Sequence, residues 1–129
     1  MKLVSVIIPS YNRLKYLQNT LKSIIQQTHK HLEIIVINDC STDENYYQFD
    51  WIGIKIIHLI KHSREVCGHP CPGYVRNKGL EQATGNYIAF CDDDDIWFPQ
   101  KLEFQLKAME NSGTLMSCTD GLIGKGVYD

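Results

Sequence analysis

Four consecutive aspartates, Asp92 to Asp95, are the residues of this sequence with the clearest capacity for chemistry. The chain has only fifteen acidic residues. Like charges at contact distance repel by roughly 1 kcal/mol in water and by more in a less polar site, so this run needs solvent, a cation or both. It is compatible with a solvated strand end, with acidic residues that favour the start of a following helix through its dipole, and with a divalent metal site.

Alternation of side chains along a strand would give the acidic run two faces. If the extended geometry persists, Asp92 and Asp94 point to one side, and Asp93 and Asp95 point to the other. One pair can then face a cleft while the other caps a helix or binds a loop. Carboxylate oxygens suit Mg²⁺ or Mn²⁺, and a small number of protein ligands leaves room for phosphate oxygens. A metal held in this way acts as a Lewis acid on a diphosphate leaving group.

Two further polar clusters follow apolar runs, "PSYNR" after the first run and "NDCSTD" after the second. In the first cluster, Tyr11 can stack on a nucleotide base and Arg13 can meet a phosphate. The alternative is an ordinary strand-to-helix turn with a polar residue near the helix cap. In the second cluster, Asp39 and Asp43 offer carboxylates to a base or a ribose, and the alternative is a loop that caps the next helix.

The hydrophobic pattern predicts the elements that position these clusters. Short β-rich runs indicate strands, and leucines and isoleucines at helical spacing indicate amphipathic helices. Residues 61–73 are expected to form a loop because glycine and proline interrupt them, and residues 41–49 a polar loop with room for a short helix. The expected strands cover residues 3–8, 32–39, 54–60, 86–91 and 114–120, and the expected helices cover residues 14–25, 74–84 and a segment that begins near Pro99.

Alternating strands and helices predict an α/β fold with an open, mostly parallel, Rossmann-like sheet flanked by helices. In such sheets, ligands bind outside the carboxyl ends of the strands. The three polar clusters follow the first, second and fourth expected strands, so we expect them on one rim. Neither GxGxxG nor GxxxxGK[ST] follows the first strand, which disfavours a Rossmann dehydrogenase and a P-loop NTPase.

Length and composition indicate a single domain over residues 1–129, with 43% hydrophobic residues available for a core. The net charge is −2 and no basic block is present, which argues against nonspecific nucleic-acid binding. No apolar run is long enough to span a bilayer, and no signal peptide is recognisable. We therefore expect a soluble, cytoplasmic protein without a transmembrane segment, which can also act at a membrane surface.

The chain has five cysteines, an odd number at irregular spacing, and we expect reduced thiols in a cytosolic compartment. The stretch "CGHPC" places Cys67, His69 and Cys71 close together, with His62 as a further zinc ligand. A structural zinc site normally takes four ligands. Because no paired CxxC motif supports such a site, an ordinary loop is the favoured interpretation.

Four segments in this order resemble the family 2 glycosyltransferases with the GT-A fold: "VSVIIPSYNRLKYLQNTLKSIIQQT", "EIIVINDCSTD", "RNKGLEQATGNYIAFCDDDD" and "IWFPQKLEFQL". The match runs from about Val4 to Leu106. The resemblance implies transfer of a sugar from a nucleotide diphosphate sugar (UDP-, GDP- or dTDP-linked) to a hydroxyl acceptor, with inversion. It also implies Mn²⁺ or Mg²⁺ as the cofactor.

The same resemblance implies roles for individual residues. Pro9 and Tyr11 resemble the residues that frame the nucleotide base, and Asp39 resembles the aspartate that hydrogen-bonds it. The family's DxD element falls on Asp92 to Asp94. It implies that Asp94 is the principal metal ligand and that Asp92 or Asp93 assists at the metal or the ribose. Arginine positions vary within the family, and the substrate-binding candidates among them here are Arg13 and Arg76.

Two departures from the family pattern leave questions open. The segment "REVCGHPCPGYV" replaces the usual short loop rich in glycine and serine, so the base preference is open. Family members usually continue well beyond residue 129, and their later half supplies the acceptor site and the catalytic base. The chain thus resembles the nucleotide-binding half, truncated at the C-terminus. Asp120 is the candidate for the base, with a turn aspartate as the alternative.

The sequence is compatible with three functions. The first is a metal-dependent glycosyltransferase. The second is a module that binds a sugar nucleotide without turnover, because the acceptor and base region is missing. The third is a zinc-stabilised interaction domain built around "CGHPC".

Overall fold

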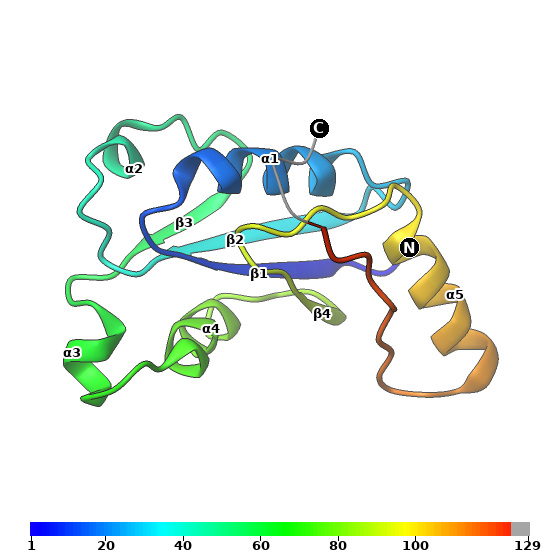
Figure 1. Ribbon diagram of the computed structural model, residues 1–129. Coiled ribbons are helices and arrows are strands. Elements are labelled where there is room, and N and C mark those ends of the chain that lie inside the picture. Colours follow the sequence, from blue (N-terminus) through cyan, green and yellow to red (C-terminus); the bar gives the residue numbers. More distant parts are fainter. Residues whose placement is uncertain (125–129) are drawn as a thin grey trace.

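A computed structural model describes residues 1–124 of the chain, and in this range a four-stranded parallel sheet forms the centre (Figure 1). The strand order is β3-β2-β1-β4, so β1 lies inside the sheet and pairs with both β2 and β4. This confirms the expected α/β class. The strands are β1 (Val4–Ser10), β2 (Leu32–Asn38), β3 (Lys55–His58) and β4 (Tyr87–Phe90).

Helices flank the sheet on both faces, with α1 on one side and α4 on the other (Figure 1). The short α2 and α3 lie beyond the carboxyl ends of the strands, where they border the same rim as the polar clusters. The helices are α1 (Leu14–Ile25), α2 (Asn45–Gln48), α3 (Ser63–Cys67), α4 (Pro72–Leu80) and α5 (Lys101–Ser112).

Alternating residues of the inner strands fill two separate cores. Strands buried on both faces form continuous apolar runs in the sequence, which is why "VII" in β1 and "IIVI" in β2 contain no polar residue. The smaller core joins Ile7 to Val75 of α4. The larger core joins the other face of β1 to α1, through Val4, Val6, Ile8, Leu17, Leu21 and Ile24.

Gly79 allows α4 to lie unusually close to the sheet. A Cβ atom at this position would be 2.6 Å from Cγ2 of Ile7 and 2.8 Å from Cδ1 of Ile37, closer than packed carbon atoms approach. A glycine is therefore required here for packing and not for backbone freedom. The close approach fixes α4, and with it Arg76 one turn earlier, relative to the ends of β1 and β2.

The segment predicted as a loop over residues 61–73 contains α3 and the start of α4. Two side chains stabilise the beginning of α3: Nδ1 of His62 accepts from the Arg64 N–H at 3.1 Å, and Asp39 accepts from the Ser63 N–H at 2.7 Å. Gly68 ends the helix with a φ of 78°, a left-handed conformation that glycine adopts readily. The prediction missed α3 because one of its caps comes from a distant strand end.

The predicted fifth strand over residues 114–120 is wrong, because this segment forms no strand. Gly113 ends α5 with a left-handed backbone, and the chain that follows is exposed, including Leu115 and Met116. A strand needs a hydrogen-bonded neighbour, and in the part of the chain that the structure describes this segment has none. Within residues 1–124, moreover, none of the helices combines the length and the apolarity needed to cross a bilayer.

Candidate functional site

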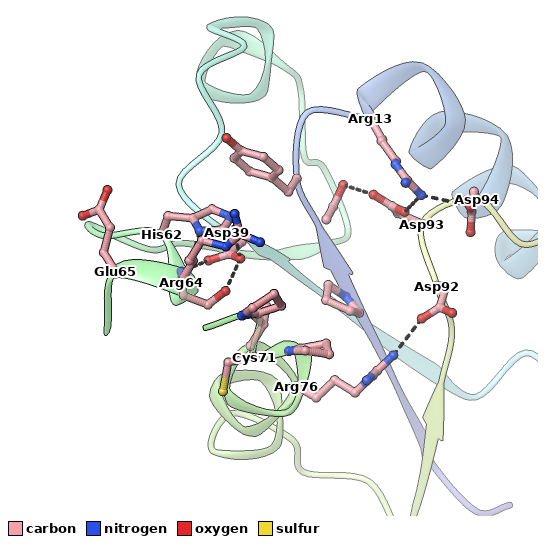
Figure 2. A pocket seen from close by; sticks show the side chains of 17 residues that line it. Arg13, Asp39, His62, Arg64, Glu65, Cys71, Arg76, Asp92, Asp93 and Asp94 are labelled. Atoms are coloured by element: carbon pink, nitrogen blue, oxygen red, sulfur yellow. Dashed lines mark hydrogen bonds and ion pairs between the residues drawn. The ribbon is translucent and has the colours of Figure 1, made fainter. Parts of the chain in front are cut away.

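A pocket of about 1000 Å³ opens at the carboxyl ends of the strands (Figure 2). It is bordered by the ends of β1 and β2, the segment after β3, the start of α4 and the acidic run after β4. This is the rim that the sheet rule predicts. The substrate-binding and metal residues that the family resemblance implies all line this one pocket: Pro9, Tyr11, Arg13, Asp39, Arg76, Asp92, Asp93 and Asp94.

Asn12 holds the β1–α1 turn against the loop after β2. Its backbone is left-handed, with a φ of 51°, which asparagine tolerates better than most residues. The Asn12 side-chain oxygen accepts from the N–H groups of Thr42 and Asp43 at 3.0 and 3.1 Å. These bonds fix the turn that presents Tyr11 and Arg13 on either side of Asn12. Asn12 lies next to the N-cap residue Arg13, as the alternative of an ordinary strand-to-helix turn expected, but its side chain binds the neighbouring loop and does not cap α1.

Asp93 is the buried member of the acidic run. Its Oδ2 accepts from the Ser10 hydroxyl at 2.8 Å, and its backbone oxygen accepts from the Thr20 hydroxyl at 3.0 Å. Burial raises the pKa of Asp93, while the Ser10 hydrogen bond and the nearby Arg13 guanidinium, 3.6 Å away, act in the opposite direction. Asp93 therefore links the acidic run to β1 and α1.

Asp92 and Asp94 are half-exposed, and each is paired with one arginine. Nη2 of Arg76 lies 2.9 Å from Asp92 Oδ1, and Nη1 of Arg13 lies 2.9 Å from Asp94 Oδ2. The arginines come from opposite sides of the sheet, since Arg76 is on α4 and Arg13 directly precedes α1. Figure 2 shows the two pairs at the same end of the pocket. Two cations and two exposed carboxylates therefore face one volume.

The donor atoms of this end fit a divalent metal held by few protein ligands. Asp92 and Asp94 offer hard carboxylate oxygens, the ligands that Mg²⁺ and Mn²⁺ take. Within residues 1–124, no three side chains of histidine, cysteine, aspartate or glutamate gather closely enough to form a complete metal cage. A metal here would need phosphate oxygens and water for its remaining positions, as Mg²⁺ commonly does.

Asp39 lies at the opposite end of the pocket, where α3 begins. Its carboxylate accepts from the N–H and the hydroxyl of Ser63, both at 2.7 Å, and lies 3.3 Å from Nε2 of His62. The His62 ring also meets Tyr11 edge to face, with centroids 4.4 Å apart. Both Asp39 oxygens thus have protein partners, and its role toward a nucleotide base stays a prediction.

One wall of the pocket comes from the segment between β3 and α4, where the sequence predicted no substrate-binding residue and where His62 and Cys71 were considered only as zinc ligands. Its lining residues include His62, Ser63, Arg64, Glu65, Pro70 and Cys71. The available signal was positional, since this segment follows the carboxyl end of a third strand in the same parallel sheet. Ser10 was missed as well, although it lies inside the quoted "PSYNR" cluster.

Several other candidates lie elsewhere in the described chain. Asp43 accepts from the N–H of Asn45, the first residue of α2, at 3.0 Å, so it contacts the start of this helix and not the pocket, while the N-cap residue itself is Glu44. Asp120 is exposed and lies outside the pocket lining in the range 1–124. His69 contacts the carbonyl of its own neighbour Pro70 at 3.0 Å. Within residues 1–124, Cys67, His69 and Cys71 do not form a group of three side chains that could hold a zinc ion.

Curated relatives extend well beyond this chain. TuaG of Bacillus subtilis (strain 168), a glycosyltransferase whose name refers to teichuronic acid biosynthesis, is 40% identical over 122 residues, which is 91% of this chain and 46% of TuaG. UDP-Glc:alpha-D-GlcNAc-diphosphoundecaprenol beta-1,3-glucosyltransferase WfaP of Escherichia coli is 38% identical over 129 residues, covering 97% of this chain and 48% of WfaP. The chain therefore spans about half the length of these relatives.

Solved structures share the fold. TarS 1-349 of S. aureus in complex with UDP superposes with a TM-score of 0.78 at 30% identity, over 100% of this chain and 38% of that chain. The mannosyltransferase PcManGT from Pyrobaculum calidifontis, in complex with GDP-Man and Mn²⁺, gives a TM-score of 0.66 at 22% identity, over 82% of this chain and 32% of that chain. The second match concerns the fold alone.

The family model of "Glycosyl transferase family 2" matches residues 5–126. This range contains all of the sheet except Val4, the acidic run and every residue of the pocket described above. The chain belongs to glycosyl transferase family 2.

Proposed function

We propose that this chain binds a nucleotide diphosphate sugar in the pocket at the carboxyl ends of the strands and serves the transfer of its sugar to a hydroxyl group. One observation carries the proposal: the side chains predicted from four separate sequence segments line a single pocket. Its volume of about 1000 Å³ is at the upper end of the usual range for ligand sites, which suits a donor of this size.

The two ends of the pocket fit the two halves of such a donor. Tyr11 and His62 offer aromatic surface at the end near Asp39, where a planar base can stack. Arg13 and Arg76 carry the positive charge at the other end, and guanidinium groups bind phosphate oxygens through paired hydrogen bonds. We therefore assign the base to the first end and the diphosphate to the second. The TarS complexes with UDP and UDP-GlcNAc favour a uridine donor as the first one to test.

We further propose that Asp94, assisted by Asp92, holds Mg²⁺ or Mn²⁺ together with the diphosphate. When bound, the ion supplies positive charge to the diphosphate as it leaves the sugar. Arg13 and Arg76 supply charge to the same group from two sides. Asp93 is buried and bonded to Ser10, so we assign it to holding the acidic run and the ribose side of the site.

The transfer itself is proposed to invert the anomeric centre. The acceptor oxygen attacks the anomeric carbon, the bond from that carbon to the phosphate oxygen breaks, and the acceptor proton passes to a base. Asp120 is the candidate for this base if the chain itself carries one, and it lies outside the pocket lining in the described range. Glu65 lines the pocket, but Figure 2 shows it at the end far from Asp94.

A second function is favoured by the same geometry. Asp92, Asp93 and Asp94, the carboxylates at the diphosphate end, are each hydrogen-bonded to an arginine or a serine. Their oxygens already have hydrogen-bond partners within the protein, so they are less available to take a proton from an acceptor hydroxyl. Taken by itself, this chain would then bind the donor without efficient transfer, with the base supplied by a further part of the enzyme.

For the acceptor, the relatives indicate a class to test. The name of WfaP gives a diphosphoundecaprenol-linked GlcNAc as its acceptor. An acceptor on such a lipid carrier would bring this protein to a membrane surface from the cytoplasm. We propose this location together with the donor function.

A donor panel tests the proposed function. The chain is incubated with UDP-, GDP- and dTDP-sugars and Mn²⁺ or Mg²⁺, and release of the nucleoside diphosphate is measured with and without sugar acceptors. The proposal expects release from at least one donor, and less release with the Asp94→Asn variant. Absence of both binding and release for the whole panel would contradict it.

A further inference from the structure

Tyr46 reaches the functional site from a helix that carries no family motif. It lies on α2 and is fully buried, while its hydroxyl is 2.7 Å from the Ser10 hydroxyl and 2.8 Å from the Arg13 amide nitrogen. Ser10 ends β1, and Arg13 directly precedes α1. The Tyr46 hydroxyl therefore connects Ser10, the last residue of β1, to Arg13, the residue directly before α1.

The directions of these hydrogen bonds follow from the number of protons available. The Ser10 hydroxyl donates its only proton to the Asp93 carboxylate at 2.8 Å. The Tyr46 hydroxyl must then donate to Ser10 Oγ, and its oxygen accepts from the Arg13 N–H. The result is a series of three bonds with one direction that begins at the Arg13 backbone and ends on Asp93. Bonds arranged in this way strengthen one another in a buried setting.

The Tyr46 ring is itself fixed by its surroundings. It belongs to the core beneath α1, and its centroid lies 6.5 Å from that of Trp51. The indole N–H of Trp51 donates to the Tyr46 carbonyl at 3.0 Å. Burial raises the pKa of Tyr46, so the phenol keeps the proton that it donates to Ser10. The hydroxyl thus has a defined position and a defined proton.

We propose that Tyr46 is a positioning residue for the diphosphate end of the pocket. Its hydroxyl orients Asp93 through Ser10, and it fixes the backbone of Arg13 by accepting a hydrogen bond from the Arg13 N–H. The inference rests on the proposed function, because it assigns to Tyr46 an effect on donor binding. Without the hydroxyl, Ser10 Oγ loses the donor that fixes its rotation, and the Arg13 N–H loses its acceptor. The Asp93 carboxylate and the Arg13 guanidinium, which meet in the pocket, then lose the support that they share through the Tyr46 hydroxyl.

The test compares two tyrosines of the same helix. Tyr46→Phe removes only the hydroxyl, and so does the control Tyr47→Phe, whose hydroxyl donates to the Ser41 carbonyl at 3.0 Å on the half-exposed side of α2. Kd for UDP is measured by calorimetry with Mn²⁺ present. We expect Kd to rise about tenfold for Tyr46→Phe, the effect of losing a buried hydrogen-bonded partner, and to stay within about twofold for Tyr47→Phe.

A double-variant cycle separates positioning from general loss of stability. Tyr46→Phe is combined with Ser10→Ala, which breaks the same series at its next bond. We expect the two effects on Kd to be non-additive by about threefold or more, because both variants interrupt one network. If Tyr46→Phe acted only by loosening the whole fold, its fold-change in Kd and that of Ser10→Ala would simply multiply in the double variant.

The outcomes distinguish this inference from the function on which it rests. If the wild-type chain binds no nucleoside diphosphate, the proposed function fails and the positioning role fails with it. If the wild-type chain binds UDP and Tyr46→Phe binds equally well, only the positioning role is overturned. Should Tyr46→Phe lose its cooperative unfolding transition, Ser10→Ala alone carries the test. A Kd within about twofold of wild type then overturns the inference, and a rise of about fivefold supports it.

Discussion

Arg13 and Asp94 are separated by 81 positions in the sequence, yet Nη1 of Arg13 lies 2.9 Å from Oδ2 of Asp94 at one end of the pocket. Both side chains are about half-exposed, and such ion pairs contribute only about 0–1 kcal/mol to stability. The pair therefore exchanges partners at low cost. A diphosphate can take the arginine, and a divalent ion can take the carboxylate.

Replacing Asp94 tests this exchange. Asp94→Asn keeps the shape of the side chain but removes its charge, so it should weaken metal-dependent UDP binding by about 1–3 kcal/mol, by analogy with charged hydrogen bonds. Calorimetry with Mn²⁺ gives the affinity. Asp95→Asn is the matched control, because Asp95 belongs to the same acidic run but lies outside the pocket lining in the described chain. Unchanged binding by Asp94→Asn would place the metal elsewhere.

Tyr11 tests the assignment of the base to the other end of the pocket. Tyr11→Ala removes the ring that packs against His62, and base contacts do not require a metal. UDP binding should weaken both with Mn²⁺ and in EDTA, by about 1–3 kcal/mol for a lost stacking partner. Tyr16→Ala, on the exposed face of α1, is the control. An effect that occurs only with metal present would reject a base-framing role for Tyr11.

Glu33 makes the stability of the fold depend on pH. Burial raises the pKa of its carboxyl, but hydrogen bonds from Ser5, Thr84 and Lys55 outweigh burial and lower the pKa from 4.5 to about 2. A group with a lowered folded-state pKa stabilises the protein above its unfolded-state pKa. That contribution is lost as the pH falls from 4.5 towards 2.

The Glu33→Gln variant isolates this contribution. It should reduce the free energy of unfolding at pH 7 by about 1–3 kcal/mol, because the amide cannot replace a carboxylate that accepts several hydrogen bonds. Urea unfolding at pH 7 and near pH 3 measures the difference, which should shrink at the lower pH. Glu110→Gln, on the exposed surface of α5, should change little at either pH. A difference that stays constant with pH would show that charge is not the cause.

Activity of the isolated chain gives another prediction. The 129-residue chain should bind a donor yet transfer sugar poorly, with slow donor hydrolysis as the residual reaction. The reason is that base catalysis is typically worth 10²–10⁴ in rate, and the pocket carboxylates at the diphosphate end are already paired. Chromatography of the products after incubation with donor and acceptor distinguishes hydrolysis from transfer. Efficient transfer that disappears in Asp120→Asn would contradict the prediction and identify Asp120 as the base.

Much of the fold could be predicted from local pattern. The apolar runs of β1 and β2 and the leucine spacing of α1 are properties of neighbouring residues, and the parallel sheet rule then placed the residues after β1, β2 and β4 on one rim. The sheet order and the pocket lining agree with that inference. The role of each lining residue is a chemical assignment that the proposed experiments address.

Other features depend on contacts across long sequence distances. The helix α3 starts where Asp39, 24 residues earlier, accepts from Ser63, and no local pattern reveals that contact. Tyr46 appeared as part of a polar loop because its buried partners are Ser10 and Arg13. The segment 114–120 looked like a strand by composition, but composition does not supply the neighbouring strand that it needs.

Binding of a nucleoside diphosphate together with a divalent ion, in the pocket at the strand ends, underlies every role proposed above. Calorimetric titration of UDP and GDP into the wild-type chain, with Mn²⁺ or Mg²⁺ and then in EDTA, measures this binding. We expect saturable binding of at least one nucleotide with metal present, and clearly weaker binding in EDTA. Equal affinity in EDTA would rule out the metal site, and no binding of either nucleotide under any condition would rule out the proposed function of the pocket.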